Sequence, residues 1–172
     1  PRQKLFVERS LAALSARDNT LGVAPTGAGK TTMLSAVTGR MTGDGAKACV
    51  LAHRDELTSQ NRAKFARVNP DVTTSIVDAT TKSWNGQVAF AMAPTLSRAA
   101  NLRAMPKLDL LVIDEAHHAV ADSDRRIIDR VRDANPEARV FGVTATPNRG
   151  DRKGLREVFD NVADQVRLGE LI

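Results

Sequence analysis

The residues best suited to chemistry fall in two short stretches that lie far apart in the chain. The first, A-P-T-G-A-G-K-T at 24–31, combines two glycines with a lysine and a threonine. Gly27 and Gly29 permit backbone angles that a side chain would forbid, so successive N–H groups can point into one concavity and bind an anion. Lys30 adds a mobile positive charge for outer phosphates, and the Thr31 hydroxyl suits Mg²⁺. The stretch predicts a phosphate-binding loop.

The second stretch is Asp114-Glu115-Ala116-His117, which directly follows the apolar run 108–113. Two adjacent carboxylates at the end of a buried strand are costly unless something binds them, and a magnesium ion shared with the phosphate loop fits that need. His117 and His118 lack the matching ligand cluster that a zinc site requires, so zinc is not predicted.

The elements around these stretches predict how they are positioned. Helices with a buried face are expected at 3–16, 33–41 and 122–135, and another is expected after Pro94. In the first of these helices, the residues expected to face inward are Leu5, Phe6, Val7, Leu11 and Leu14. Apolar runs predict strands at 21–24, 48–52, 74–77, 87–92, 108–113 and 139–143. This alternation predicts an α/β fold, an open and mostly parallel sheet with helices on both faces and its ligand at the carboxyl ends of the strands.

The composition is that of one compact domain. The chain has 172 residues, 42% of them hydrophobic and 26% charged, and its net charge of +5 is compatible with an anionic partner. No apolar run is long enough to span a membrane. Cys49 is the single cysteine and is expected in the core. Because one cysteine cannot form an internal disulfide, the sequence agrees with a cytoplasmic location. A basic cluster at 149–156 either faces a partner or forms a solvated loop.

Five motifs occur in the order typical of superfamily two helicases. They are the stretch 24–31 (motif I, with Ala24 where the general phosphate loop has glycine), L-A-H-R-D-E-L at 51–57 (Ia), T-L-S-R at 95–98 (Ib), D-E-A-H at 114–117 (II) and T-A-T-P at 144–147 (III). The chain therefore resembles the first RecA-like lobe of a superfamily two DEAD/DEAH-box helicase. The closest resemblance is to the group that includes type III restriction helicase subunits and DNA-repair helicases of the XPB kind.

The resemblance implies ATP and Mg²⁺ as cofactors. It implies that Thr31 and Asp114 hold the metal, that Glu115 activates the attacking water, and that Lys30 acts with them in catalysis. Gln3 would read the adenine edge, although a helix-entry glutamine that faces water is an equal alternative. The implied nucleotide-binding residues are Gln3, Pro25, Thr26, Gly27, Ala28, Gly29, Lys30, Thr31 and Thr32.

The resemblance also implies a nucleic-acid interface. His53 and Arg54 from motif Ia would grip the phosphate backbone, together with Thr95, Ser97 and Arg98 from motif Ib. The alternatives are an exposed loop pair in the first case, and a Ser/Thr helix cap with a solvated arginine in the second. His117, Thr144 and Thr146 would couple the nucleotide to the nucleic-acid side.

Together these expectations describe residues 1–172 as the N-terminal RecA-like ATP-binding lobe of a helicase or translocase. Mg-ATP hydrolysis would drive movement on DNA, or less readily on RNA. A second RecA-like lobe in cis would be the other partner, and without that lobe's arginines the isolated lobe is expected to hydrolyse ATP poorly. The alternative is an ATP-dependent switch or scaffold that acts on a protein, which would not need motifs Ia and Ib. A small-molecule kinase does not explain motifs II and III.

Overall fold

The computed structural model describes residues 2–16, 19–24, 29–43, 45–145 and 149–165. Its strands are β1 (Thr20–Val23), β2 (Ala48–Ala52), β3 (Thr74–Val77), β4 (Val88–Met92), β5 (Leu110–Asp114), β6 (Arg139–Thr144) and β7 (Asn161–Gln165). They form one sheet in the order β3-β4-β2-β5-β6-β1-β7, and every neighbouring pair is parallel. The predicted parallel α/β sheet is confirmed.

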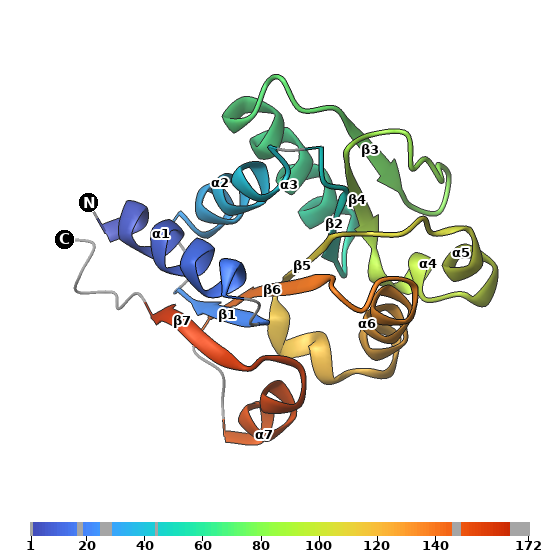
Figure 1. Ribbon diagram of the computed structural model, residues 1–172. Helices are drawn as coiled ribbons and strands as arrows, with labels where there is room; N and C mark the ends of the chain where they lie inside the picture. The colour runs from blue at the N-terminus through green and yellow to red at the C-terminus, as the bar shows by residue number, and fades with distance from the viewer. Residues whose placement is uncertain (1, 17–18, 25–28, 44, 146–148, 166–172) are drawn as a thin grey trace.

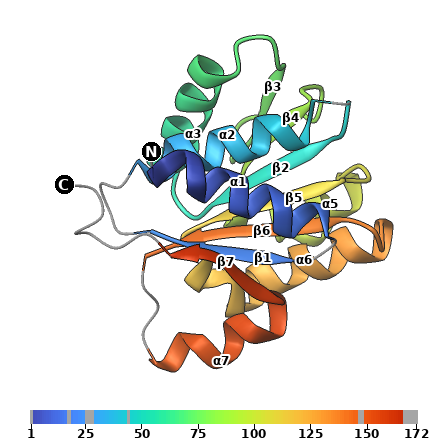
Figure 2. The same ribbon diagram turned by 60° about the vertical axis from the view of Figure 1, so that its left-hand side comes forward.

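Helices cover both faces of this sheet (Figures 1 and 2). One face carries α1 (Arg2–Ser15), α2 (Lys30–Met41) and α3 (Asp55–Val68). The opposite face carries α4 (Ala93–Leu96), α5 (Ala99–Ala104), the 3-10 helix η1 (Ala116–Val120), α6 (Asp122–Ala134) and α7 (Arg149–Val158). Among the described residues, no helix combines the length and the apolarity needed to cross a bilayer.

The core lies in two apolar layers, one on each side of the sheet. Phe6, Leu34 and Phe65 belong to the layer under the first group of helices, and Leu96 and Ile127 belong to the layer under the second. Strand β5 is buried along its whole length between these layers, which explains its continuous run of Leu, Val and Ile. Cys49 lies in the core, as predicted, and burial raises the pKa of its thiol.

Strand ends and helix starts meet at one edge of the sheet. Helix α2 begins directly after Gly29, whose φ of 76° lies in the left-handed region that favours glycine. Two residues lie between the end of β2 at Ala52 and the start of helix α3 at Asp55, and the second of them, Arg54, is the N-cap of the helix. Since all strands are parallel, these junctions and the end of β5 gather at the same edge, where the fold class expects a ligand.

The C-terminal part differs from the sequence-based expectation. The basic cluster at 149–156 lies within helix α7 rather than in a solvated loop, and the edge strand β7, which pairs with β1, was not predicted. Leu155, Val158 and Phe159 anchor this region and are each at most 5% exposed. These few apolar residues within a charged segment leave a weak sequence pattern. Leu5 was predicted to be buried and is 41% exposed.

Candidate active site

Of the predicted phosphate loop at 24–31, the structure describes Ala24 and the three residues Gly29, Lys30 and Thr31. A Cβ built on Gly29 would lie 2.1 Å from Nε2 of Gln3, so the glutamine amide at the start of α1 packs directly against the loop. Thr31 and Thr32 follow in the first turn of α2 and are partly exposed. Pro25, Thr26, Gly27 and Ala28 lie outside the described residues. The first helical turn of α2 therefore presents Lys30 and two hydroxyls beside the Gln3 amide.

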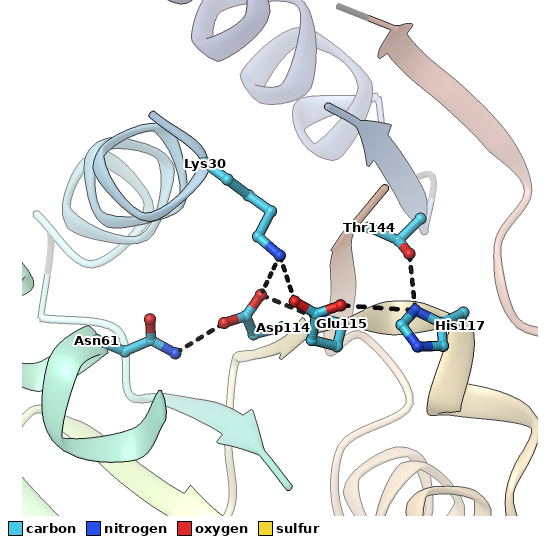
Figure 3. Close-up of polar contacts among 6 residues, drawn as sticks. All are labelled: Lys30, Asn61, Asp114, Glu115, His117 and Thr144. Atoms are coloured by element: carbon cyan, nitrogen blue, oxygen red, sulfur yellow. Dashed lines mark hydrogen bonds and ion pairs between the residues drawn. The ribbon is translucent and has the colours of Figure 1, made fainter. Parts of the chain in front are cut away.

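Lys30 reaches from the start of α2 to the two carboxylates at the end of β5 (Figure 3). Its Nζ lies 2.6 Å from Oε1 of Glu115 and 3.3 Å from Oδ1 of Asp114. Burial alone would lower the pKa of Lys30, but the charge of Asp114 and the hydrogen bond to Glu115 outweigh it and raise this pKa. The lysine is therefore protonated at neutral pH and neutralises part of the buried negative charge.

Glu115 adopts an unusual backbone conformation. Its φ is 54°, the one positive φ of a non-glycine residue among those described. A left-handed residue with a side chain costs about 1–3 kcal/mol, so the surrounding structure must stabilise it. The conformation turns the chain sharply after β5, where Glu115 N–H donates to Oδ1 of Asp114 at 2.9 Å. Both carboxylates can consequently face Lys30 although they are adjacent in sequence.

The amide of Asn61 makes a contact with Asp114 that the sequence did not predict. Its Nδ2 donates to Oδ2 of Asp114 at 3.1 Å, from the buried side of α3. Thr58, Asn61 and Phe65 are the buried residues of α3, and they are spaced as one face of a helix. An asparagine at a buried position of this helix face could have indicated such a contact from the sequence, because a buried amide requires a hydrogen-bonding partner.

His117 connects the end of β5 to the end of β6. Its Nδ1 lies 3.0 Å from Oγ1 of Thr144 and 3.7 Å from Oε2 of Glu115. The predicted coupling residues His117 and Thr144 are therefore in contact, and Figure 3 shows the imidazole between Thr144 and Glu115. Thr146, the third predicted coupling residue, lies outside the described residues.

The donor set fits Mg²⁺. This ion prefers oxygen ligands, and it is usually bound through one or two carboxylates, water and substrate phosphates rather than by a cage of protein groups. The Asp114 carboxylate and the Thr31 hydroxyl can supply such ligands. The arrangement is suited to a magnesium–phosphate complex.

The predicted nucleic-acid residues lie at the carboxyl ends of β2 and β4. Arg54 is exposed at the N-cap of α3, whereas His53 turns toward α6, where its Nε2 lies 2.9 Å from Oδ1 of the fully buried Asp124. The hydrogen bond and the charge of Asp124 raise the pKa of His53, although desolvation opposes them.

Motif Ib contributes one exposed cation. Thr95 and Ser97 are at most 9% exposed, and the Ser97 hydroxyl donates to the carbonyl oxygen of Pro94 at 3.2 Å. Arg98 is exposed at the N-cap of α5. Among these five residues, the two arginines are exposed, and the nucleic-acid assignments of all five stay predictions.

A family model matches residues 1–149 of this chain; its description is "Type III restriction enzyme, res subunit". The chain belongs to this family. The resemblance to the superfamily two helicase group that includes type III restriction helicase subunits is thereby confirmed.

Individual relatives agree with the family. The chain is 32% identical over 132 residues to a protein of Saccharomyces cerevisiae named putative ATP-dependent helicase IRC3, covering 73% of this chain and 19% of that protein. It is 30% identical over 161 residues to the mouse ATP-dependent RNA helicase DHX58, covering 80% and 24%. The chain thus spans about a fifth to a quarter of the length of these relatives.

A solved structure supports the fold. The helicase domain of Hef from Pyrococcus furiosus superimposes with a TM-score of 0.80 at 18% identity, covering 95% of this chain and 37% of that one. At this identity the likeness speaks for the fold alone, and it confirms the predicted RecA-like architecture.

Proposed function

We propose that this chain is the ATP-binding lobe of an ATP-dependent helicase or translocase that moves on nucleic acid, with DNA as the favoured track. The observation that carries the proposal is the contact of Lys30, at the head of α2, with Asp114 and Glu115 at the end of β5. The family description, which names a restriction enzyme, favours DNA. A second RecA-like lobe in cis and a cytoplasmic location belong to the same proposal.

The proposal gives each residue of the site a role. Lys30 would exchange its carboxylate partners for the outer phosphates of ATP, because a phosphate carries more negative charge than either carboxylate. Asp114 and Thr31 would hold Mg²⁺, which, when bound, neutralises charge on the phosphate oxygens. The released Glu115 carboxylate would orient a water molecule and accept its proton as the water oxygen attacks the γ-phosphorus and ADP leaves.

His117 would transmit the movement of Glu115 to the end of β6. It touches Glu115 on one side and Thr144 on the other, so a movement of Glu115 alters the contacts of the β6 end. Gln3 would bind the adenine edge from its place beside Gly29, because an amide both donates and accepts hydrogen bonds.

The decisive experiment is ATP hydrolysis by the full-length protein, alone and with single-stranded DNA, duplex DNA or RNA. We expect DNA to raise the rate, and the matched variant Glu115→Gln to abolish hydrolysis with every polymer. Stimulation by RNA alone would reassign the track. If no polymer raises the rate but a protein partner does, the chain is an ATP-dependent switch and the motor proposal is wrong.

A further inference from the structure

Asn61 lies where helix α3 passes the end of the central strand. Its side chain is 1% exposed and that of Asp114 is 2% exposed, so their hydrogen bond is shielded from water. Figure 3 shows the amide and Lys30 on different sides of the Asp114 carboxylate. A buried polar contact of this kind must be well satisfied, because leaving either group without its partner is destabilising.

The hydrogen bonds of Asp114 divide between its two oxygens. Oδ1 accepts from Glu115 N–H and lies near Lys30 Nζ, while Oδ2 accepts from the Asn61 amide. The amide therefore fixes the rotation of the carboxylate and leaves Oδ1 directed toward Lys30 at the start of α2. Because Asn61 is neutral, it orients the carboxylate without adding a positive charge that would repel a divalent cation.

The same helix begins at the candidate nucleic-acid contact. Arg54 is the N-cap of α3, and its carbonyl oxygen accepts a hydrogen bond from Oγ1 of Thr58 at 3.0 Å. Asn61 lies seven positions after Arg54 in the chain, which corresponds to about 10 Å of α-helix. Helix α3 also packs on α2, whose first residue is Lys30. A displacement of the Arg54 end would therefore move the Asn61 amide along with the helix.

We propose that Asn61 is a positioning residue that orients Asp114 for Mg²⁺ and transmits the occupancy of the Arg54 phosphate contact to the metal site. The inference rests on the proposed function and names a route of regulation within it. The amide acts through Asp114 and does not itself touch the nucleotide. Coupling of this kind is reciprocal, so Mg-nucleotide must alter nucleic-acid affinity by the same factor by which nucleic acid alters nucleotide affinity.

The test compares Asn61→Ala with Asn69→Ala in the full-length protein. Asn69 is a matched control because its Nδ2 also links α3 to a neighbouring element, by donating to the carbonyl oxygen of Ser35 at 3.0 Å, at the far end of the helix. Binding of a fluorescent ATP analogue is titrated with and without Mg²⁺. We expect Asn61→Ala to raise the half-saturating Mg²⁺ concentration by about tenfold, as loss of a partner of a metal ligand typically does. Metal-free nucleotide affinity should stay within about twofold.

The second readout is coupling. Affinity for a DNA oligonucleotide is measured with and without the Mg-nucleotide, and the ratio of the two values should approach one in Asn61→Ala while Asn69→Ala keeps the wild-type ratio. If the two variants behave alike in both titrations, the inference is wrong.

Should Asn61→Ala unfold at assay temperature, it is replaced by Asn61→Ser, which keeps a shorter hydrogen-bond donor. An intermediate shift in Mg²⁺ dependence would then support the inference, and a wild-type value would overturn it.

The two proposals fail in different ways. If wild-type hydrolysis responds to no nucleic acid, the proposed function is wrong, yet the Mg²⁺ titration still decides whether Asn61 positions Asp114. If wild-type hydrolysis is stimulated and Asn61→Ala changes neither the Mg²⁺ dependence nor the coupling ratio, the proposed function stands and the inference about Asn61 falls.

Discussion

Lys30 contacts both carboxylates, yet removing the lysine and removing one carboxylate should affect different steps, nucleotide binding in the first case and hydrolysis in the second. Lys30→Ala takes away the cation for the phosphates and leaves Asp114 and Glu115 to repel them. We expect nucleotide affinity to fall by at least about tenfold. Glu115→Gln keeps the shape of the side chain, so affinity should change little, while hydrolysis falls by at least about 10²-fold for want of a base.

These values are obtained from nucleotide titrations and single-turnover hydrolysis in the full-length protein. Unchanged nucleotide affinity in Lys30→Ala would count against the predicted phosphate-binding loop. Loss of nucleotide binding in Glu115→Gln would instead assign Glu115 a structural role.

The left-handed backbone of Glu115 leads to a prediction about stability. At φ 54° a glycine is unstrained while an alanine is not, so Glu115→Gly should unfold with a free energy about 1 kcal/mol higher than Glu115→Ala. Ala66 is the matched control because it lies exposed within α3, where Ala66→Gly should lower the free energy of unfolding by about 1 kcal/mol. Denaturant titrations measure both differences, and an equal or greater stability of Glu115→Ala would contradict the strained conformation.

At the scale of elements, His53 and Asp124 join the end of β2 to α6. The pKa of His53 is raised in the folded protein, so its pairing stabilises the fold fully below the unfolded pKa near 6.5 and loses this contribution as pH rises through the higher folded value. We expect His53→Gln to lower the free energy of unfolding by about 2 kcal/mol at pH 6, and by less at pH 9.

Urea unfolding at a series of pH values between 6 and 9 measures this difference. The non-titrating glutamine serves as its own reference across the series. A cost that is constant over this range, or that grows with pH, would show that the pair does not titrate as the structure indicates.

The sequence predicted elements whose patterns are continuous. The apolar residues 110–113 predict β5 because a strand covered on both faces must be apolar throughout, and Gly29 has the left-handed φ of 76° that favours glycine directly before α2. Asn61 could not be assigned a role, because its partner Asp114 lies 53 residues away and the contact exists only once α3 packs beside β5. Helix α7 and strand β7 depend likewise on tertiary packing of a few apolar side chains.

At the scale of the whole molecule, the residues of the candidate site meet at one edge of a single parallel sheet. Gln3, Gly29 and Lys30 come from the α1 and α2 starts, and Asp114 and Glu115 come from β5. Lys30 is the cation that the described residues bring to the two carboxylates. A phosphoryl group in transfer carries charge on three oxygens, which one lysine and one metal neutralise incompletely.

Residues 1–172 alone are therefore expected to bind Mg-ATP weakly and to hydrolyse it about 10³-fold more slowly than the full-length protein, since a transition-state arginine is worth about 10³ to 10⁵ in rate. The isolated chain is first shown to unfold cooperatively, so that a low rate is not due to misfolding. Its Glu115→Gln variant measures the background of the assay. A rate for residues 1–172 that equals the full-length rate, and that Glu115→Gln removes, would mean that this lobe neutralises the transition state without an arginine from elsewhere.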